Sequence, residues 1–275
     1  MEVVNIENEI RKLIDTAGCF AVLEYERDAS VTAEQAGEER AKAAMGVRRR
    51  QLMVRLNGEN AVTMEAGAMQ WTAGDIRITS GFDGAKDFLG KWIHSAVTEE
   101  SMVKPRYEGN GIIALEPTYK HILLEEVGRF GSQGMTISDG MFLACDENVR
   151  IRTTARNTVS SAVAGKEGMF NTNLTGYGIV ALKSNVPEIE LMEIRLDGDE
   201  DELRLDGNMA VCWSTSLKFT VETSSASLVS SAINKEGLVN VYRGKGIVLI
   251  SPVAEVRMLT DDDKKNEANP HHHSR

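Results

Sequence analysis

The sequence is poor in the residues that metal sites and disulfide frameworks require. Its 275 residues include three cysteines, Cys19, Cys145 and Cys212, and none of them stands in a Cys-x-x-Cys pair. Outside the C-terminal tail the only histidines are His94 and His121. We therefore expect three buried thiols in a reducing compartment, with no metal and no cofactor.

Long hydrophobic runs are also absent. No stretch of about 18 apolar residues occurs, so no membrane span is expected. Residues 1–5, Met-Glu-Val-Val-Asn, lack a basic segment followed by an apolar one, which argues against a signal peptide. Early acidic residues argue against a mitochondrial presequence, so we expect a cytoplasmic protein. The formal net charge of −10 disfavours a general nucleic-acid-binding surface.

Catalytic motifs are missing as well. There is no Gly-x-Ser-x-Gly motif, and the isolated histidines do not form the ligand set of a cupin-type metal site. Gly-x-Gly occurs three times, but without the third glycine and following helix of a nucleotide-binding loop. We interpret these glycines as turn or bulge positions and predict no catalytic residues.

The N-terminal region predicts two helices and one strand. Apolar spacing indicates a helix over residues 5–17, begun by Asn5 and ended by Gly18. Residues 20–25 read as a strand, and residues 33–45 as a second helix with a Thr32–Gln35 capping box. The arginines at 48–50 are interpreted as a solvated run beyond that helix.

From about residue 51 the pattern becomes that of an all-β protein, with short alternating apolar runs separated by glycines. Within this region one motif recurs three times, and its second glycines are separated by 67 and 68 residues. Glycine-containing turns near residues 67, 140 and 207 keep a similar spacing, and Cys145 and Cys212 are expected to hold equivalent strand positions. The three motifs are Tyr107-Glu-Gly-Asn-Gly-Ile-Ile-Ala-Leu115, Leu174-Thr-Gly-Tyr-Gly-Ile-Val-Ala-Leu182 and Tyr242-Arg-Gly-Lys-Gly-Ile-Val-Leu-Ile250.

These repeats predict the domain organisation. Residues 1–50 form an N-terminal helical extension with a first strand, and residues 51–121, 122–190 and 191–260 form three jelly-roll or β-sandwich-like repeats in a pseudo-threefold arrangement. Each repeat reads strand, turn, strand, Glu-Gly, strand, Gly-x-Gly, strand. The tail at 261–275, which contains three consecutive histidines, is expected to be disordered.

One compact group of hydrogen-bonding side chains stands out as a possible binding feature: Thr118, Tyr119, Lys120 and His121. It follows the first Gly-x-Gly strand, where a simple strand-terminal turn is the alternative. The copies differ here and in an insertion at residues 81–87, so a function specific to this chain is expected at these places.

Several segments together resemble the altered-inheritance-of-mitochondria family in its bacterial branch. They include Leu115-Glu-Pro-Thr-Tyr-Lys-His121, Asp139-Gly-Met-Phe-Leu-Ala-Cys145 and Glu236-Gly-Leu-Val-Asn-Val-Tyr-Arg-Gly-Lys-Gly246, within residues 51–257. The resemblance implies a fold similar to the tryptophan RNA-binding attenuation protein, and it supplies no catalytic residues. Lys166 and Lys235 depart from the family's Gly-Glu-Gly pattern at its first position.

Three functions remain open. The leading hypothesis is a non-enzymatic binding or scaffold protein with a protein partner or self-association. The second is small-ligand or RNA binding by analogy with the attenuation protein, which the differing charges of Glu108, Thr175 and Arg243 at matching positions disfavour. A cupin-like jelly-roll enzyme is the third.

Overall fold

The computed structural model describes residues 2–79, 104–138, 140–155, 170–207, 209–223 and 238–252. In this part the chain is mostly β. The N-terminal third contains β1 (Arg11–Ala17), β2 (Phe20–Tyr25), α1 (Ala36–Ala44), β3 (Arg50–Met64), β4 (Met69–Thr79) and β5 (Arg106–Leu115).

The rest of the chain adds strands and short 3-10 helices. The middle contains β6 (His121–Glu126), η2 (Val127–Phe130), β7 (Met135–Ile137), β8 (Phe142–Asp146), β9 (Val149–Ala155), β10 (Phe170–Gly176) and β11 (Ile179–Ser184). The last part contains η4 (Glu188–Glu190), β12 (Met192–Leu196), β13 (Glu202–Asp206), β14 (Ala210–Ser214), β15 (Lys218–Thr223), β16 (Leu238–Arg243) and β17 (Gly246–Ile250).

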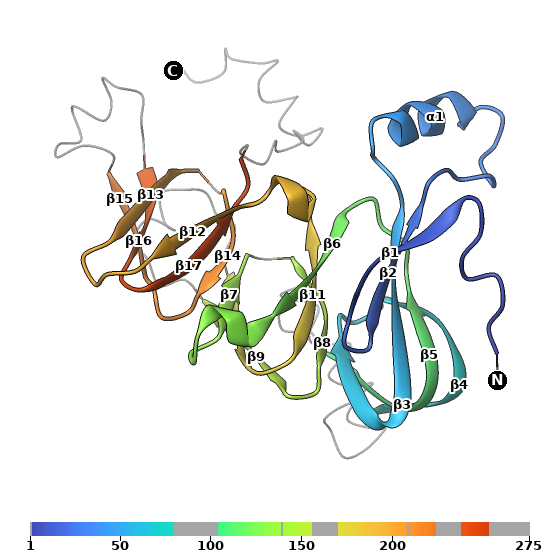
Figure 1. Cartoon of the computed structure of the whole chain (residues 1–275), viewed down its shortest axis with the longest axis horizontal. Coiled ribbons are helices and arrows are strands. Elements are labelled where there is room, and N and C mark those ends of the chain that lie inside the picture. The colour runs from blue at the N-terminus through green and yellow to red at the C-terminus, as the bar shows by residue number, and fades with distance from the viewer. Residues whose placement is uncertain are drawn as a thin grey trace, which may run out of the picture.

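These strands form several antiparallel sheets that follow one another along the long axis of the molecule (Figure 1). The largest has the order β1-β2-β3-β8-β11-β6, with β5 also paired to β3 and β4 paired to β5. A second sheet has the order β12-β17-β14-β7-β10-β9, and a third the order β13-β16-β15. The sheets therefore join strands that are distant in the sequence.

Buried apolar side chains form three main clusters. The first core includes Leu52 and Ile113, the second Ile137 and Leu182, and the third surrounds Trp213. Strands at the boundaries contribute to two cores, because successive side chains of a strand point to opposite faces. In β8, for example, Ala144 belongs to the first core and Cys145 to the second.

The predicted helix at residues 5–17 is wrong. Residues 11–17 form β1, which pairs with β2 in a hairpin that turns at Gly18, where φ is +57°. Leu13 and Ile14, on the predicted apolar face, are 40% and 49% exposed. Pairing with β2 satisfies the backbone along this stretch, so tertiary context overrides a weak local pattern.

The second predicted helix exists, but two details differ. It begins at Ala36, with Gln35 at the N-cap position and no side-chain cap bond, so the Thr32–Gln35 capping box does not form. The arginine run after it is not a solvated surface. Arg50 is 5% exposed and forms an ion pair with Glu24 at 2.7 Å. The run instead lies between α1 and the start of β3.

Two of the Gly-x-Gly motifs form corners between consecutive strands. The third lies inside β5, at a point where β4 passes close to it. Turns separate β10 from β11 and β16 from β17 at these motifs, as predicted. In the first copy β5 continues through Gly109 and Gly111, contrary to the predicted break. A Cβ on Gly109 would lie 2.0 Å from the Asp75 carbonyl oxygen, so the close approach of β4 requires glycine.

The predicted equivalence of Cys145 and Cys212 is also wrong. Cys145 lies opposite Val180, whereas Cys212 lies opposite Leu249. Val180 aligns with Val248 in the recurring motif, so the two cysteines are one strand position apart. Both are fully buried, as expected, while Cys19 is half-buried.

Other expectations from the sequence concern residues outside the described part of the chain. These are the insertion at 81–87, His94, the Glu-Gly positions near Lys166 and Lys235, and the tail at 261–275.

Candidate functional site

The predicted binding feature lies where α1 meets the β structure, and Tyr119 is its centre. The Tyr119 hydroxyl donates to the Glu39 carboxylate, whose oxygens lie 2.8 and 2.9 Å away, and accepts from Arg49 Nε at 3.0 Å. Lys42 and Arg49 also lie over its ring, 5.1 and 5.3 Å from the centroid. Since α1 has no buried residue, these contacts hold it in place.

The other three predicted residues have separate environments. Thr118 exchanges backbone hydrogen bonds with Arg50 at 2.7 and 2.8 Å, and its hydroxyl accepts from the Lys120 N–H at 3.1 Å. The Lys120 side chain is exposed. His121 opens β6 opposite Ser184 and is half-buried; burial, with Arg50 nearby, lowers its pKa. The four side chains therefore share one turn but do not converge on one point.

The surrounding charges are paired with one another. Glu24 binds both Arg48, at 2.8 Å, and Arg50, while Arg49 pairs with Asp28 at 2.8 Å. We call these residues, with Glu39, Lys42 and Tyr119, the α1 charge cluster. Its cations are committed to internal carboxylates, so the cluster is arranged to anchor α1 rather than to hold an external anion.

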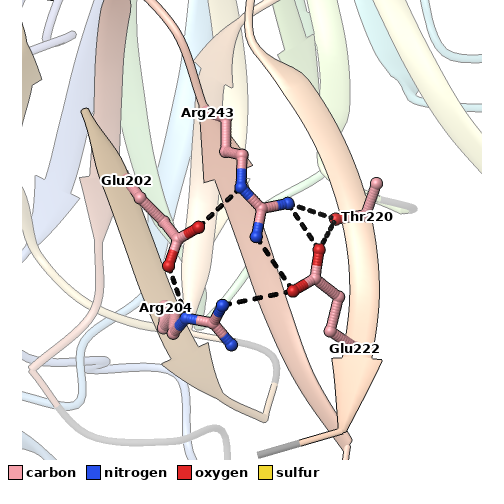
Figure 2. A network of polar contacts seen from close by, with 5 residues as sticks. All are labelled: Glu202, Arg204, Thr220, Glu222 and Arg243. Atoms are coloured by element: carbon pink, nitrogen blue, oxygen red, sulfur yellow. Dashed lines mark hydrogen bonds and ion pairs between the residues drawn. The ribbon is translucent and has the colours of Figure 1, made fainter. Parts of the chain in front are cut away.

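A second polar network covers the exposed face of the sheet β13-β16-β15 (Figure 2). Arg243, at its centre, bonds Glu202 on one side and Glu222 and Thr220 on the other, and Arg204 bridges the two carboxylates. The hydrogen bond from Arg243 lowers the pKa of Glu222 to about 2. Both carboxylates stay ionised at neutral pH. Since an ionised carboxylate has no proton to donate, neither is suited to general acid catalysis.

Sequence reasoning missed this network. The sequence alternates along residues 217–223, with Leu217, Phe219 and Val221 on one face. This pattern puts Thr220 and Glu222 on the other, polar face, which is a usable signal. Their partners on β13 and β16 are 18 to 23 residues away in the sequence. Only strand pairing brings them together.

The three cysteine thiols are poor nucleophiles, because their pKa values are raised. Burial, aided by the nearby Asp146 carboxylate, raises the pKa of Cys19 to about 12. Burial also raises the pKa of Cys145 to about 12 and that of Cys212 well above its usual range. Because the thiolate is the nucleophile, none of the three is suited to covalent catalysis.

The described residues contain no group of three or more His, Cys, Asp or Glu side chains placed to hold a metal ion. Among the same residues, no helix has the length and apolar character needed to cross a membrane.

The two corners between strands are capped by side chains that sequence reasoning also missed. Asp146, at the end of β8, accepts the Ile179 N–H at 2.7 Å. Ser214, at the end of β14, accepts the Ile247 N–H at 2.9 Å. Each acceptor satisfies the first backbone donor after a Gly-x-Gly turn.

Comparison with known proteins agrees with the all-β architecture. Among solved structures, the X-ray crystal structure of a protein from Streptococcus pyogenes is 23% identical and has a TM-score of 0.52. The similarity covers 76% of this chain and 89% of that one, and at this identity it concerns the fold alone. No curated protein matches the chain.

A family comparison extends over most of the chain. The model of the mitochondrial biogenesis AIM24 family matches residues 45–253, from just before β3 to just after β17. This range agrees with the resemblance inferred from the recurring motifs. The protein therefore belongs to the mitochondrial biogenesis AIM24 family.

Proposed function

We propose that this protein is a non-enzymatic binding or scaffold protein built from three tandem copies of one jelly-roll-like β unit. The units are residues 51–121, 122–190 and 191–260, preceded by an extension at 1–50 and followed by a tail at 261–275. The observation that carries the proposal is a pattern of strand pairing that recurs three times. The described residues also show no catalytic constellation beside it.

The recurring pattern concerns the strand that follows each glycine turn. β4, β8 and β14 pair with β5, β11 and β17, and each pairing has a register shift after its first residue pair. Past that shift the opposed residues are Trp71 and Ala114, Ala144 and Ala181, and Cys212 and Leu249. A common bulge at a common place supports one ancestral unit, because bulges are specific features of a fold.

The corner caps support the same equivalence. Asp146 and Ser214 occupy matching places, 68 residues apart, and accept the N–H groups of Ile179 and Ile247, which are also 68 apart. We propose that the three units form a pseudo-threefold series, in which each unit is related to the next in the same way, of the kind implied by the attenuation-protein resemblance. The three unpaired thiols are compatible with the reducing cytoplasm, where we place the protein.

Nucleic-acid binding is the weaker alternative. A repeated binding surface would need cations at matching places, yet Glu108, Thr175 and Arg243 differ in charge. Arg243 is moreover held by two carboxylates on its own sheet. A cupin-like enzyme has even less support, since the described residues offer no metal ligand set.

The place we propose for partner binding is the exposed side of the turn Thr118–His121, beside the α1 charge cluster. Within this turn, Lys120 is the one exposed residue whose side chain forms no hydrogen bond or ion pair with the described residues. This turn is also where the three units differ in sequence.

The experiment is affinity capture of the tagged full chain, followed by mass spectrometry and reconstitution of any stoichiometric partner. Lys120→Glu should reduce recovery of that partner, while Lys245→Glu, an exposed matched change in the last Gly-x-Gly turn, should not. Turnover of a metabolite by the purified protein, with no partner recovered, would refute a non-enzymatic role.

A further inference from the structure

Two junctions in the molecule are built in the same way. At the first, the end of β3 pairs antiparallel with β8, and Met64 lies opposite Ala144. Two flanking bonds extend this pairing: the Glu65 N–H donates to the Leu143 carbonyl at 2.8 Å, and the Glu147 N–H donates to the Ala61 carbonyl at 3.1 Å. A strand of the first proposed unit thus continues a sheet of the second.

The second junction repeats this arrangement one unit later. β7 pairs antiparallel with β14, and Ile137 lies opposite Cys212. The Ser138 N–H donates to the Val211 carbonyl at 3.3 Å, and the Thr215 N–H donates to the Gly134 carbonyl at 3.0 Å. The same set of backbone groups is therefore used at both junctions.

The strands that would form a third junction are each paired along one side alone within the described residues. β13 corresponds to β7 and the end of β3, and its one partner among the described strands is β16. β4 corresponds to β8 and β14, and in the described part of the chain it pairs with β5 alone. An unpaired strand edge presents backbone donors and acceptors that readily take a further strand.

The side chains on these two edges match the junction pattern. The inward residues of the incoming strand are Val62 and Met64 at the first junction and Met135 and Ile137 at the second, all fully buried. β13 offers Leu203 and Leu205 at the matching places, because Leu203 pairs with Tyr242 as Met135 pairs with Leu174. The incoming strand is thus apolar at the same two positions in all three units.

The receiving strand is also suitable. Trp71 in β4 takes the place of Ala144 and Cys212, and it packs on a small apolar cluster of Leu23, Met53 and Ala114 on the outer face of its sheet. On β13, the face opposite Leu203 and Leu205 carries the exposed side chains of Glu202 and Arg204. Their charges are balanced within the network of Figure 2. The edge is therefore not blocked by a run of like charge.

We propose that β13 of one copy adds to the β4 edge of a second copy, forming a third junction between chains with Leu205 opposite Trp71 and Arg204 opposite Thr72. β4 and β13 lie toward opposite ends of the molecule (Figure 1), so a neighbouring copy reaches the edge directly, whereas one chain would have to bend back on itself. Such a head-to-tail contact is heterologous and builds rings or filaments. The inference rests on the three-unit equivalence in the proposed function.

The test uses two single variants, Thr72→Cys and Arg204→Cys, mixed in equal amounts under mild oxidation. A disulfide dimer should form in the mixture, because directly opposed antiparallel residues lie within disulfide reach. Thr72→Cys mixed with Lys218→Cys, which is exposed on β15 of the same sheet, should give no more dimer than wild type. Absence of the specific dimer would overturn the proposal. So would a chain carrying both substitutions that forms the disulfide only within itself and never between two chains.

Light scattering gives an independent measurement. The wild-type mass should exceed that of one chain and rise with concentration, and Trp71→Glu should reduce it to one chain. Ile78→Glu, an exposed change farther along β4, should leave the assembly intact, and circular dichroism verifies that both variants fold. A single-chain mass for wild type at every concentration would refute self-association, while recovery of a different partner would leave the proposed binding role standing.

Discussion

Asp146 offers a direct test of both the fold and the proposed repeat. Its carboxylate accepts the Ile179 N–H at 2.7 Å at the corner between β10 and β11, and it accepts the thiol of Cys19 at 3.5 Å. Replacing Asp146 with alanine removes both acceptors. The Ile179 N–H then loses its partner beside the Gly-x-Gly turn.

The expected magnitude follows from the type of bond. A hydrogen bond to a charged group contributes about 1.5–3 kcal/mol, and one between neutral groups about 0.5–1.5 kcal/mol. Because Asp146 is half-buried, we expect Asp146→Ala to lower the free energy of unfolding by about 2 kcal/mol. Ser214→Ala, which removes the neutral acceptor of Ile247, should cost about 1 kcal/mol.

The informative variant is Asp146→Ser. If the two corners are equivalent, serine at 146 can accept the Ile179 N–H as Ser214 accepts that of Ile247, and about half of the loss should be recovered. Urea unfolding followed by circular dichroism measures the free energy, and amide hydrogen exchange at Ile179 localises the effect. The pKa of Cys19 should also fall, because Asp146 helps to raise it.

Two results would contradict this reasoning. If Asp146→Ala unfolds at the same urea concentration as wild type, the carboxylate does not stabilise the corner. If Asp146→Ser is as unstable as Asp146→Ala while Ser214→Ala is also destabilised, the two corners are not interchangeable, and the proposed repeat loses its strongest local support.

Three further predictions concern other sites. Tyr119→Phe removes the hydroxyl between Glu39 and Arg49, so amide exchange in α1 should accelerate several-fold while the thermal midpoint of the β structure stays unchanged. Cys145 and Cys212 should resist Ellman's reagent at pH 7 in the folded protein and react after denaturation; rapid native reaction would contradict their raised pKa values. His121 has a lowered pKa in the folded state, so its stabilising contribution is present above about pH 6.5 and is lost as the pH falls. His121→Asn should therefore lose less unfolding free energy than wild type between pH 8 and pH 5, and equal losses would contradict this assignment.

Local patterns predicted the elements whose residues interact mainly with near neighbours. The strand at 20–25, the helix near 33–45 and the alternating segment at 217–223 were predicted correctly, because apolar periodicity and glycine turns are short-range signals. The helix at 5–17 failed because its apolar spacing is weak and β2 offers better backbone pairing. The predicted capping box at Thr32 was wrong, because the helix begins about one turn later, at Ala36.

The amino-acid sequence by itself determined the β class, the family and the lack of a Gly-x-Ser-x-Gly or nucleotide-loop motif, since composition and motif spacing need no knowledge of contacts. Only the tertiary structure decided which strands lie side by side, because the hydrogen bonds of a sheet join residues far apart in the chain. It placed Tyr119 against α1, buried Arg50 beside Glu24, and shifted Cys212 one position from Cys145. Register is a property of paired strands, so a single strand's sequence does not contain it.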